Sequence, residues 1–472
     1  MGISPSPNER VGLLVLAAGA GTRLRSALPK ALHTVAGVPM VERVLRAGAG
    51  ARPDAVALVV SKETSDLGSR LAVPGCVPTV VQDPPRGTGQ AVHLGLKTLA
   101  GIDRLVVLYC DHPLLEPESV AGLLAGARSS GAKVTVLSAI LDHGAAYGRI
   151  VRDEAGRPVG IAERRDDDPA ARTGAVEINS GMMVLDAHWA RRALGALRPS
   201  GATGEFYLTE LVAIAAAEAK PDAPWPVAVV AGTPDDALGV NDRVDLSRAE
   251  SRAWERKRER LMRAGVTMRL PETIIIDEDV RVGADSVILP HSQVLGETIV
   301  GEGCLIGPSA VLSNARLGNR VIVRSSTVED SAIADDTDVG PYAHLRGGCE
   351  IGPHTHIGNF AELKNARLAS GVKVGHFGYI GDTSIGEEAN IGAGAVTANF
   401  DGTAKHRTEI GARAFIGSGT ILRAPIRIGD DARTGAGSVV TKDVADGATV
   451  VGIPARVVRR APIRADESTG EV

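Results

Sequence analysis

A period of six residues in the C-terminal half of the chain constrains the fold more than any other feature of the sequence. Aliphatic residues recur at this spacing from residue 276 to residue 312, often followed by glycine, and the pattern resumes at residue 333. Such a period fits neither a helix nor ordinary strand alternation, but it is typical of hexapeptide repeats, in which three short strands close one coil. The sequence therefore predicts a parallel β-helix over residues 269–460. We expect the breaks in the period to be loops, near residues 317–328, 381–385 and 397–409.

Residues 11–243 follow a different pattern, in which short apolar runs rich in β-branched residues alternate with helical segments. This alternation is typical of a mostly parallel, doubly wound sheet, which binds ligands beyond the C-terminal ends of its strands. The predicted strands cover residues 11–19, 55–61, 77–82, 104–110, 133–140 and 182–186. The predicted helices cover residues 39–50, 87–100, 117–130 and 205–219. The predicted fold class is α/β plus all-β, with a Rossmann-like domain preceding the β-helix.

The remaining segments and the composition complete the predicted organisation. Residues 244–268 are highly charged and are predicted to form a connecting helix, while residues 1–10 and 461–472 are predicted to be a flexible and a disordered tail. A length of 472 residues favours two domains. A formal net charge of -4 gives no reason to expect nucleic acid or a membrane as partner. Four cysteines without a CxxC pair and an N-terminus without a signal pattern predict a cytoplasmic protein.

A glycine-rich turn follows the first predicted strand and is a candidate phosphate-binding site. Gly19 and Gly21 open the turn, and Arg23 and Lys30 follow at positions where they could neutralise a polyphosphate. The third glycine of the dinucleotide-binding fingerprint is missing. The turn alone therefore leaves two interpretations open, a phosphate-binding loop and a tight turn with solvent-exposed cations.

Polar side chains interrupt the hexapeptide pattern between residues 344 and 410. Arg346 and Lys364 are 18 residues apart, one full coil, and each follows an inward aliphatic residue. They should therefore stack about 5 Å apart on one face, where an anion such as a sugar phosphate would relieve their repulsion. His376 is a candidate general base because histidine titrates near neutral pH, although it could also serve only to form a turn. We interpret His354 and His356 as turn residues.

Seven motifs, in the same order along the chain, carry a resemblance to a known family. They are "GTRL…LPKALH", "QDPPRGTGQA", "LYCDHPLL", "YGRIV", "EINSGM", "GEFYLTE" and "GVNDR". Followed by hexapeptide repeats, they resemble the bifunctional enzymes of bacterial UDP-N-acetylglucosamine synthesis. In these enzymes an N-acetylglucosamine-1-phosphate uridylyltransferase is fused to a glucosamine-1-phosphate N-acetyltransferase. The resemblance extends from about residue 11 to residue 450.

The resemblance implies a Mg²⁺-dependent uridylyltransferase site in the N-terminal domain, with UTP as co-substrate. Asp111 and Asn241 would hold the metal, and we expect Asp111 alone of the Cys110–His112 triplet to face it, because adjacent residues at a strand end point in different directions. The implied substrate contacts are the backbone of Leu16, Ala17, Ala18 and Gly19 for uridine and phosphate, Arg23 and Lys30 for the UTP phosphates, Gln82, Gly87 and Thr88 for the uracil edge, Gly148, Glu163 and Asn179 for sugar and ribose, and Tyr109 as a further contact. Gln82 suits the uracil edge because its amide can both donate and accept.

In the C-terminal domain the resemblance implies an N-acetyltransferase that uses acetyl-CoA, with His376 as the general base. It further implies that the coil is left-handed and that the protein is a homotrimer with the acyl site between subunits. The implied sugar-phosphate contacts are Arg346, Lys364, Tyr379 and Asn390. The implied acetyl-CoA contacts are Ala393, Asn399, Phe400, Ser418 and Ala436, with Lys405 reaching from the same loop as Phe400.

The chain departs from the family pattern at four positions. Cys110 stands where the family usually has glycine, His112 where it has a small or apolar residue, Arg165 where lysine is common, and Phe400 where tyrosine is common. These departures keep open a related enzyme that acts on another amino- or cyclitol-phosphate. A nucleotidyltransferase whose β-helix serves only oligomerisation or regulation is a further alternative, which Lys364, His376 and Asn390 disfavour.

Overall fold

The structure is a computed structural model that describes residues 9–19, 21–71, 77–142, 147–163, 174–200 and 204–459. The chain separates into two compact units, Met1–Ala253 and Trp254–Val472. Their boundary lies inside helix α7 (Arg243–Arg263). Most of the two predicted tails lies outside the described residues. Within the described part, no helix combines the length and the hydropathy needed to span a lipid bilayer.

The first unit is built on one mixed sheet with the strand order β11-β7-β10-β6-β1-β4-β5. Strands β6, β1, β4 and β5 are parallel, so their C-terminal ends meet at one edge, whereas β10 runs antiparallel between β6 and β7. The strands are β1 (Val11–Ala17), β4 (Ala55–Val60), β5 (Thr79–Val81), β6 (Arg104–Tyr109), β7 (Val134–Leu141), β10 (Val176–Asp186) and β11 (Val227–Ala231). Two hairpins flank this sheet, β2 (Thr34–Val35) with β3 (Val38–Pro39), and β8 (Arg149–Arg152) with β9 (Pro158–Ala162).

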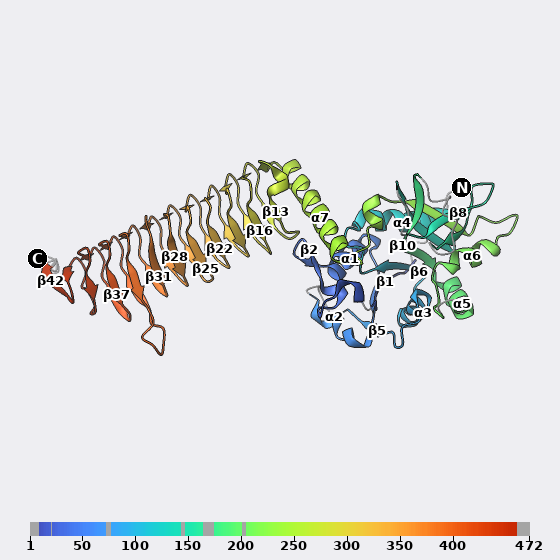
Figure 1. Cartoon of the computed structure of the whole chain (residues 1–472), viewed down its shortest axis with the longest axis horizontal. Coiled ribbons are helices and arrows are strands. Elements are labelled where there is room, and N and C mark those ends of the chain that lie inside the picture. Colours follow the sequence, from blue (N-terminus) through green and yellow to red (C-terminus); the bar gives the residue numbers. More distant parts are fainter. Residues whose placement is uncertain are drawn as a thin grey trace, which may run out of the picture. The chain divides into compact units, whose positions relative to one another are not determined.

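Helices cover both faces of this sheet, which is why its central strands are apolar on both sides (Figure 1). Along β1, Leu14 and Leu16 pack in one cluster with residues of α3, α5 and α6, while Leu13 and Val15 pack in another with residues of α1 and α4. The helices are α1 (Met40–Gly48), α2 (Leu67–Arg70), α3 (Thr88–Thr98), α4 (Pro117–Ser130), α5 (Ala187–Ala196) and α6 (Glu210–Ala217).

The second unit is the predicted left-handed parallel β-helix of hexapeptide repeats. Its three sheets contain only parallel pairs apart from the terminal β41–β42 hairpin, and they begin at β12 (Thr267–Met268), β13 (Ile275–Ile276) and β14 (Arg281–Val282). Because Ile288 pairs with Ile306 one coil later, the aliphatic column of the repeat fills the interior. The predicted fold class is confirmed.

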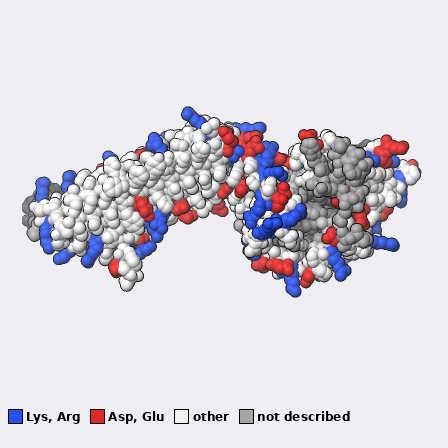
Figure 2. Space-filling view, in the orientation of Figure 1, with Lys and Arg blue, Asp and Glu red and all other residues white. Residues whose placement is uncertain are grey.

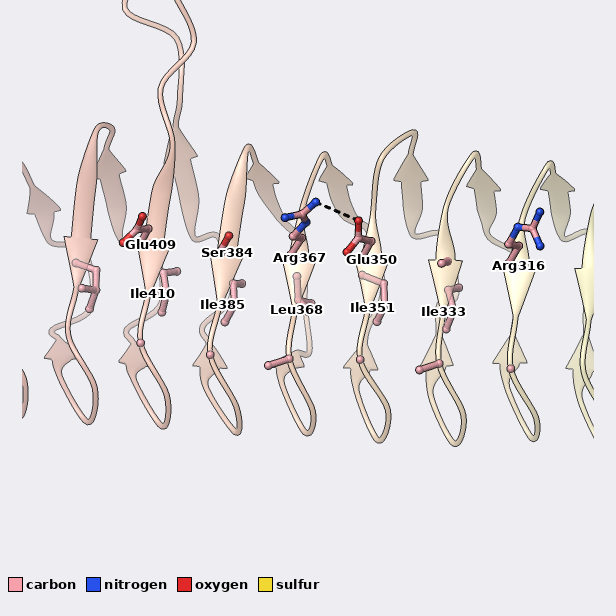
Figure 3. A pocket seen from close by; sticks show the side chains of 18 of the residues that line it. Arg316, Ile333, Glu350, Ile351, Arg367, Leu368, Ser384, Ile385, Glu409 and Ile410 are labelled. Atoms are coloured by element: carbon pink, nitrogen blue, oxygen red, sulfur yellow. Dashed lines mark hydrogen bonds and ion pairs between the residues drawn. The ribbon is translucent and has the colours of Figure 1, made fainter.

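One face of the β-helix shows this division between inside and outside clearly. In Figure 3 the side chains of Ile351, Leu368 and Ile385 form one column, and those of Glu350, Arg367 and Ser384 form a separate polar column. The polar column includes an ion pair between Arg367 and Glu350, with Nη2 3.3 Å from Oε1. A groove of about 1030 Å³ follows this face, and none of the predicted site residues lines it.

Two of the three breaks in the hexapeptide period are not loops. Leu312 pairs with Val328, a step of 16 residues instead of 18, so the coil near residues 317–328 is shortened within its turns. At residues 381–385, Asp382 alone forms the corner between β31 (Gly378–Gly381) and β32 (Thr383–Ile385). The prediction of loops at these two places was wrong because a deletion and an insertion both shift the phase. The third break is a loop, and Figure 1 shows it projecting from the coils between β34 (Val396–Ala398) and β35 (Thr408–Ile410).

Helix α7 ends at Arg263, so the predicted connecting helix of residues 244–268 extends too far at its C-terminal end. Gly265, with φ of +96°, follows the helix, and strand β12 begins two residues later. Lysines and arginines gather along α7 (Figure 2). One of them, Lys257, is buried and donates to the backbone carbonyls of Glu278 and Val280 at 2.7 Å each, which ties the end of the helix to the first coil.

Candidate active sites

A cavity of about 350 Å³ opens at the C-terminal ends of β1 and β6 and contains most of the predicted nucleotide contacts. The predicted residues that line it are Leu16, Ala18, Gly19, Lys30, Gln82, Gly87, Thr88, Tyr109 and Asp111. An adjoining cavity of about 420 Å³ shares Ala18, Gly19, Lys30 and Gln82 and adds Ala17. The strand order brings these segments together because the C-terminal ends of neighbouring parallel strands meet at one edge.

Asp111 is the electrostatic centre of this cavity. Its Oδ2 lies 2.5 Å from Nζ of Lys30, and its Oδ1 lies 3.0 Å from Nδ1 of His112. Burial opposes ionisation of the carboxyl, but the hydrogen bond and charge of His112, together with Lys30, outweigh burial and hold the pKa of Asp111 below its usual range. The carboxylate is therefore ionised at neutral pH.

Asn241 is held next to Asp111 by the backbone. The N–H of Val240 donates to the carbonyl of Asp111 at 2.8 Å, and the Asn241 side-chain oxygen accepts from Nη2 of Arg23 at 2.8 Å. Oδ1 of Asn241 thus faces a cation, as Oδ2 of Asp111 does. Two oxygen donors of this kind fit Mg²⁺, which keeps several waters and substrate oxygens in its shell. Consistent with so small a protein contribution, no group of three His, Cys, Asp or Glu residues is placed to hold a metal within the described part of the chain.

His112 is a site residue that sequence reasoning missed. Strand β6 ends at Tyr109, and the N–H of His112 donates to the Tyr109 carbonyl at 3.3 Å, so His112 lies in a turn. The alternation of side chains along a strand therefore does not apply, and the imidazole contacts the carboxylate from which it was expected to point away. The sequence signal was the histidine itself, at a position where the family pattern has a small or apolar residue.

Gln82 is buried, and both hydrogens of its amide are used within the protein. Nε2 donates to the Gly87 carbonyl at 2.9 Å and to Oε1 of Gln90 at 2.8 Å. The interpretation that the amide would donate to uracil as well as accept from it is therefore wrong. Its carbonyl oxygen remains as an acceptor for an N–H of the base. Thr88 next to Gly87 is also engaged, because its hydroxyl accepts from the Leu208 N–H at 3.1 Å.

The three predicted sugar contacts form a cluster of their own beside this cavity. The N–H of Asn179 donates to the Gly148 carbonyl at 2.8 Å, and the hydroxyl of Thr209 donates to Oε1 of Glu163 at 3.1 Å. Tyr109 joins the two groups, since both Asp111 and Glu163 contribute to raising its pKa, although burial is the main cause. Arg165, one of the four departures, lies outside the described residues.

The Cys110 side chain is part of the buried core and only borders the cavity. It packs in a cluster with Leu108 and Leu115. Burial, reinforced by the charge of Asp111, raises the pKa of the Cys110 thiol to about 12, so the thiol stays protonated at neutral pH.

We therefore expect Cys110→Ala to affect stability more than catalysis. Loss of the buried sulfur should lower the free energy of unfolding by about 1 kcal/mol. The KM values for UTP and the sugar phosphate should stay within about twofold, since the lost contacts are with the core. Urea unfolding and steady-state kinetics measure the two effects, and a large KM change at unchanged stability would assign the cysteine to substrate selection instead.

In the β-helix, the structure brings Arg346 and Lys364 into direct register on adjacent strands, β25 (His344–Arg346) and β28 (Ala361–Lys364). Arg346 is paired with Glu362 at 2.9 Å, so its charge is partly balanced. Lys364 instead lies beside the ammonium of Lys405, which is the main cause that lowers its pKa, followed by Arg346. The cationic pair predicted from spacing is thus a cluster of three cations and one acid.

We expect this cluster to bind a phosphate group, with Lys364 as its most sensitive member. Lys364→Ala should raise the KM for the sugar phosphate about 10- to 100-fold, the value of a charged hydrogen bond. Because its pKa is lowered, Lys364 loses its charge at a lower pH than an ordinary lysine does, so binding should weaken as the pH rises. Lys364→Arg should remove this alkaline loss, and Lys373→Ala, at an exposed lysine on β30 (Lys373–Val374), is the matched control.

His376 and three predicted acetyl-CoA contacts occupy the same corner on successive coils. Backbone hydrogen bonds of 2.6 to 2.7 Å join these coils, from Gly394 to Phe377, from Gly419 to Ala393 and from Gly437 to Ser418. The residues at this corner are His376, Ala393, Ser418 and Ala436. They form a continuous row along the edge where two sheets of the β-helix meet.

The sugar contacts lie on either side of that corner and not on a single face. Tyr379 is on β31, in the same sheet as Arg346 and Lys364, and its charge contributes to raising the pKa of Arg346, after Glu362. Asn390 is on β33 (Asn390–Ile391), in the adjoining sheet. The corner therefore separates Asn390 from the other predicted contacts, and His376 lies exposed between them.

The loop between β34 and β35 carries the remaining predicted residues. Asn399 is buried at its base and donates from Nδ2 to Oδ2 of Asp382 at 2.5 Å, so its side chain is engaged within the protein. Phe400 pairs with Lys405 across the loop and is 60% exposed. Asp401 fixes the turn by accepting from the N–H groups of Thr403 and Ala404, which leaves the aromatic ring at the surface.

Comparison with known proteins assigns a family to each unit. Residues 13–200 match the model described as MobA-like NTP transferase domain. Residues 279–314 and 407–442 match the model described as bacterial transferase hexapeptide (six repeats).

Three relatives, each named bifunctional protein GlmU, match both units at once. The relative from Pelobacter propionicus is 40% identical over 445 residues, which is 94% of this chain and 96% of the relative. The relative from Synechococcus sp. is 38% identical over 443 residues, again 94% and 96%. The relative from Heliobacterium modesticaldum is 40% identical over 442 residues, 93% of this chain and 94% of the relative. The chain therefore belongs to the GlmU family of bifunctional transferases, which confirms the family that the motifs predict.

Proposed function

We propose that this protein makes UDP-N-acetylglucosamine in two steps at two separate sites. The β-helix transfers the acetyl group of acetyl-CoA to glucosamine-1-phosphate. The N-terminal unit then transfers a uridylyl group from UTP to N-acetylglucosamine-1-phosphate and releases pyrophosphate. The observation that carries the proposal is that Lys30, Gln82 and Asp111 line one cavity in the first unit, while Lys364 and His376 lie near one corner of the second. Both reactions use cytoplasmic metabolites, so we place the enzyme in the cytoplasm.

Uridylyl transfer requires positioning and charge neutralisation but no protein nucleophile. An oxygen of the sugar phosphate attacks the α-phosphorus of UTP in line, and pyrophosphate leaves. Lys30 and Arg23 neutralise the phosphates, and the Gln82 carbonyl accepts from the uracil N–H. Asp111 and Asn241 would hold Mg²⁺, which would supply further positive charge to the phosphates.

Acetyl transfer requires a base, because the sugar amine must lose a proton when it forms the new amide bond. The nitrogen attacks the thioester carbonyl of acetyl-CoA, His376 accepts the amine proton, and the CoA thiolate leaves and is protonated. Arg346 and Lys364 hold the sugar phosphate, with Tyr379 and Asn390 on the sugar. Acetyl-CoA lies along Ala393, Ser418 and Ala436 toward Asn399 and Phe400. Phe400 can stack on this ligand but lacks the hydroxyl of the more common tyrosine.

The acetyl-transfer site requires a second copy of the chain. Its residues lie on a convex corner and on the two sheets beside it, and a convex edge cannot enclose a cofactor of the size of acetyl-CoA. We infer a homotrimer in which the neighbouring β-helix covers this corner. Sedimentation equilibrium should give about three times the chain mass of 48.8 kDa, and a mass of one chain with full acetyltransferase activity would contradict the trimer.

The proposed function is tested with purified wild-type protein and the two sugar phosphates. Glucosamine-1-phosphate with acetyl-CoA should give N-acetylglucosamine-1-phosphate, and this product with UTP and Mg²⁺ should give UDP-N-acetylglucosamine and pyrophosphate. Phosphorus NMR resolves all of these species. Turnover of a different amino- or cyclitol-phosphate, with neither of the two expected reactions, would replace the proposed substrates and favour a related enzyme.

A further inference from the structure

The carboxylate of Asp111 has a separate partner on each of its two oxygens. Nδ1 of His112 lies 3.0 Å from Oδ1, and Nζ of Lys30 lies 2.5 Å from Oδ2. Because an ionised carboxylate only accepts hydrogen bonds, Nδ1 of His112 is the donor. The terminal torsion of an aspartate is otherwise broad, so two partners on opposite oxygens restrict its rotation. Each oxygen keeps a further acceptor site for another ligand.

The imidazole of His112 is itself held between the two segments that carry the proposed metal ligands. It is 9% exposed, and its ring lies edge-on to Tyr109, with the ring centroids 6.1 Å apart. On the other side it meets Gly239, where a Cβ would come within 3.2 Å of Nε2. Residues 239–241 are joined to Asp111 by the Val240 backbone bond at 2.8 Å. The ring therefore fills the space between Asp111 and the segment that bears Asn241.

We propose that His112 is a positioning residue for uridylyl transfer. Its Nδ1–H holds Oδ1 of Asp111, so that the carboxylate presents one orientation to a divalent cation, and its ring fixes the approach of residues 239–241. The inference rests on the proposed function of this cavity. Partners that orient a metal ligand in this way typically change metal affinity about 10- to 100-fold when they are removed.

A set of substitutions at residue 112 separates the hydrogen bond from the packing of the ring. His112→Ala removes both. His112→Asn places an amide donor near the position of Nδ1, whereas His112→Gln places its donor near the position of Nε2. Gly239→Ala leaves His112 intact but adds a methyl group within 3.2 Å of Nε2, which should displace the ring from the other side.

Mn²⁺ provides a readout that does not depend on catalysis. Mn²⁺ alone is titrated with the full-length protein, and the relaxation enhancement of water protons gives its Kd. We expect His112→Ala and Gly239→Ala to raise the Kd at least about tenfold, and His112→Asn to remain within about threefold of wild type. His112→Gln should resemble the alanine variant. Thermal melting identifies a variant that does not fold, in which case the asparagine and glutamine variants decide the result.

Three results would overturn the inference: a His112→Ala protein with the wild-type Kd, a His112→Gln protein that keeps the wild-type Kd while His112→Asn does not, or failure of both to restore it. Failure of the proposed function is a separate result. In that case wild-type protein does not convert UTP and N-acetylglucosamine-1-phosphate, whatever its Mn²⁺ affinity. A wild-type enzyme that makes UDP-N-acetylglucosamine, with unchanged Mn²⁺ affinity in the alanine variant, would overturn the role of His112 alone.

Discussion

Asp111→Asn should reduce the kcat of uridylyl transfer by about 10³-fold and leave acetyl transfer unchanged. The substitution keeps the size of the side chain but removes the charge that pairs with Lys30 at 2.5 Å and that is proposed to hold Mg²⁺. Since this reaction depends on positioning and charge, the loss should be at least that of removing one preorganised electrostatic group, about 10²- to 10³-fold. Uridylyl transfer is followed by release of pyrophosphate, and acetyl transfer by release of CoA thiol.

Asp153→Asn is the matched control for this experiment. Asp153 pairs with Arg157 at 2.8 Å in the β8–β9 hairpin and has no role in the proposed site. This variant should keep both activities within about twofold, as expected of a surface ion pair. Uridylyl transfer that survives in Asp111→Asn at more than a tenth of the wild-type rate would remove Asp111 from the proposed metal site.

His376→Ala should reduce the kcat of acetyl transfer by about 10²- to 10⁴-fold, the range attributed to general acid–base catalysis. The KM for glucosamine-1-phosphate should change little, because the phosphate is held by Arg346 and Lys364. Uridylyl transfer should keep the wild-type rate. The thiol release assay measures the first effect, and pyrophosphate release measures the last.

The chain offers a control histidine in an equivalent setting. His354 also lies exposed at a corner of the β-helix, with φ of +57°, and its N–H donates to the Asp335 carbonyl. His354→Ala should keep both activities, since it touches none of the proposed contacts. If the two histidine variants lose acetyl transfer equally, the effect is structural and His376 is not the base.

The sequence predicts the second unit well because its repeat has one strong period. An inward aliphatic residue on every short strand fills a narrow interior, and the pairing of Arg346 with Lys364 follows from 18 residues per coil. The same period does not distinguish a shortened turn from an insertion. For this reason the one-residue corner at Asp382 was predicted as a loop, while the longer loop at residues 399–407 was predicted correctly.

In the first unit, the candidate residues were predicted better than their contacts. Motif spacing assigns Lys30, Gln82 and Asp111 to one ligand, and the parallel strands bring them to one cavity. How each side chain is engaged depends on segments that are distant in sequence or that leave the strand early. Both amide hydrogens of Gln82 are taken up by Gly87 and Gln90, and His112 turns back onto Asp111 because β6 ends at Tyr109.

Mixing Asp111→Asn with His376→Ala tests most directly the claim that each unit carries its own active site. Each variant alone, given glucosamine-1-phosphate, acetyl-CoA, UTP and Mg²⁺, should fail to make UDP-N-acetylglucosamine at an appreciable rate. The mixture should make it, because Asp111→Asn releases N-acetylglucosamine-1-phosphate and His376→Ala consumes it. An inactive mixture of two variants that each retain one half-reaction, or a single substitution that removes both half-reactions, would contradict two independent sites.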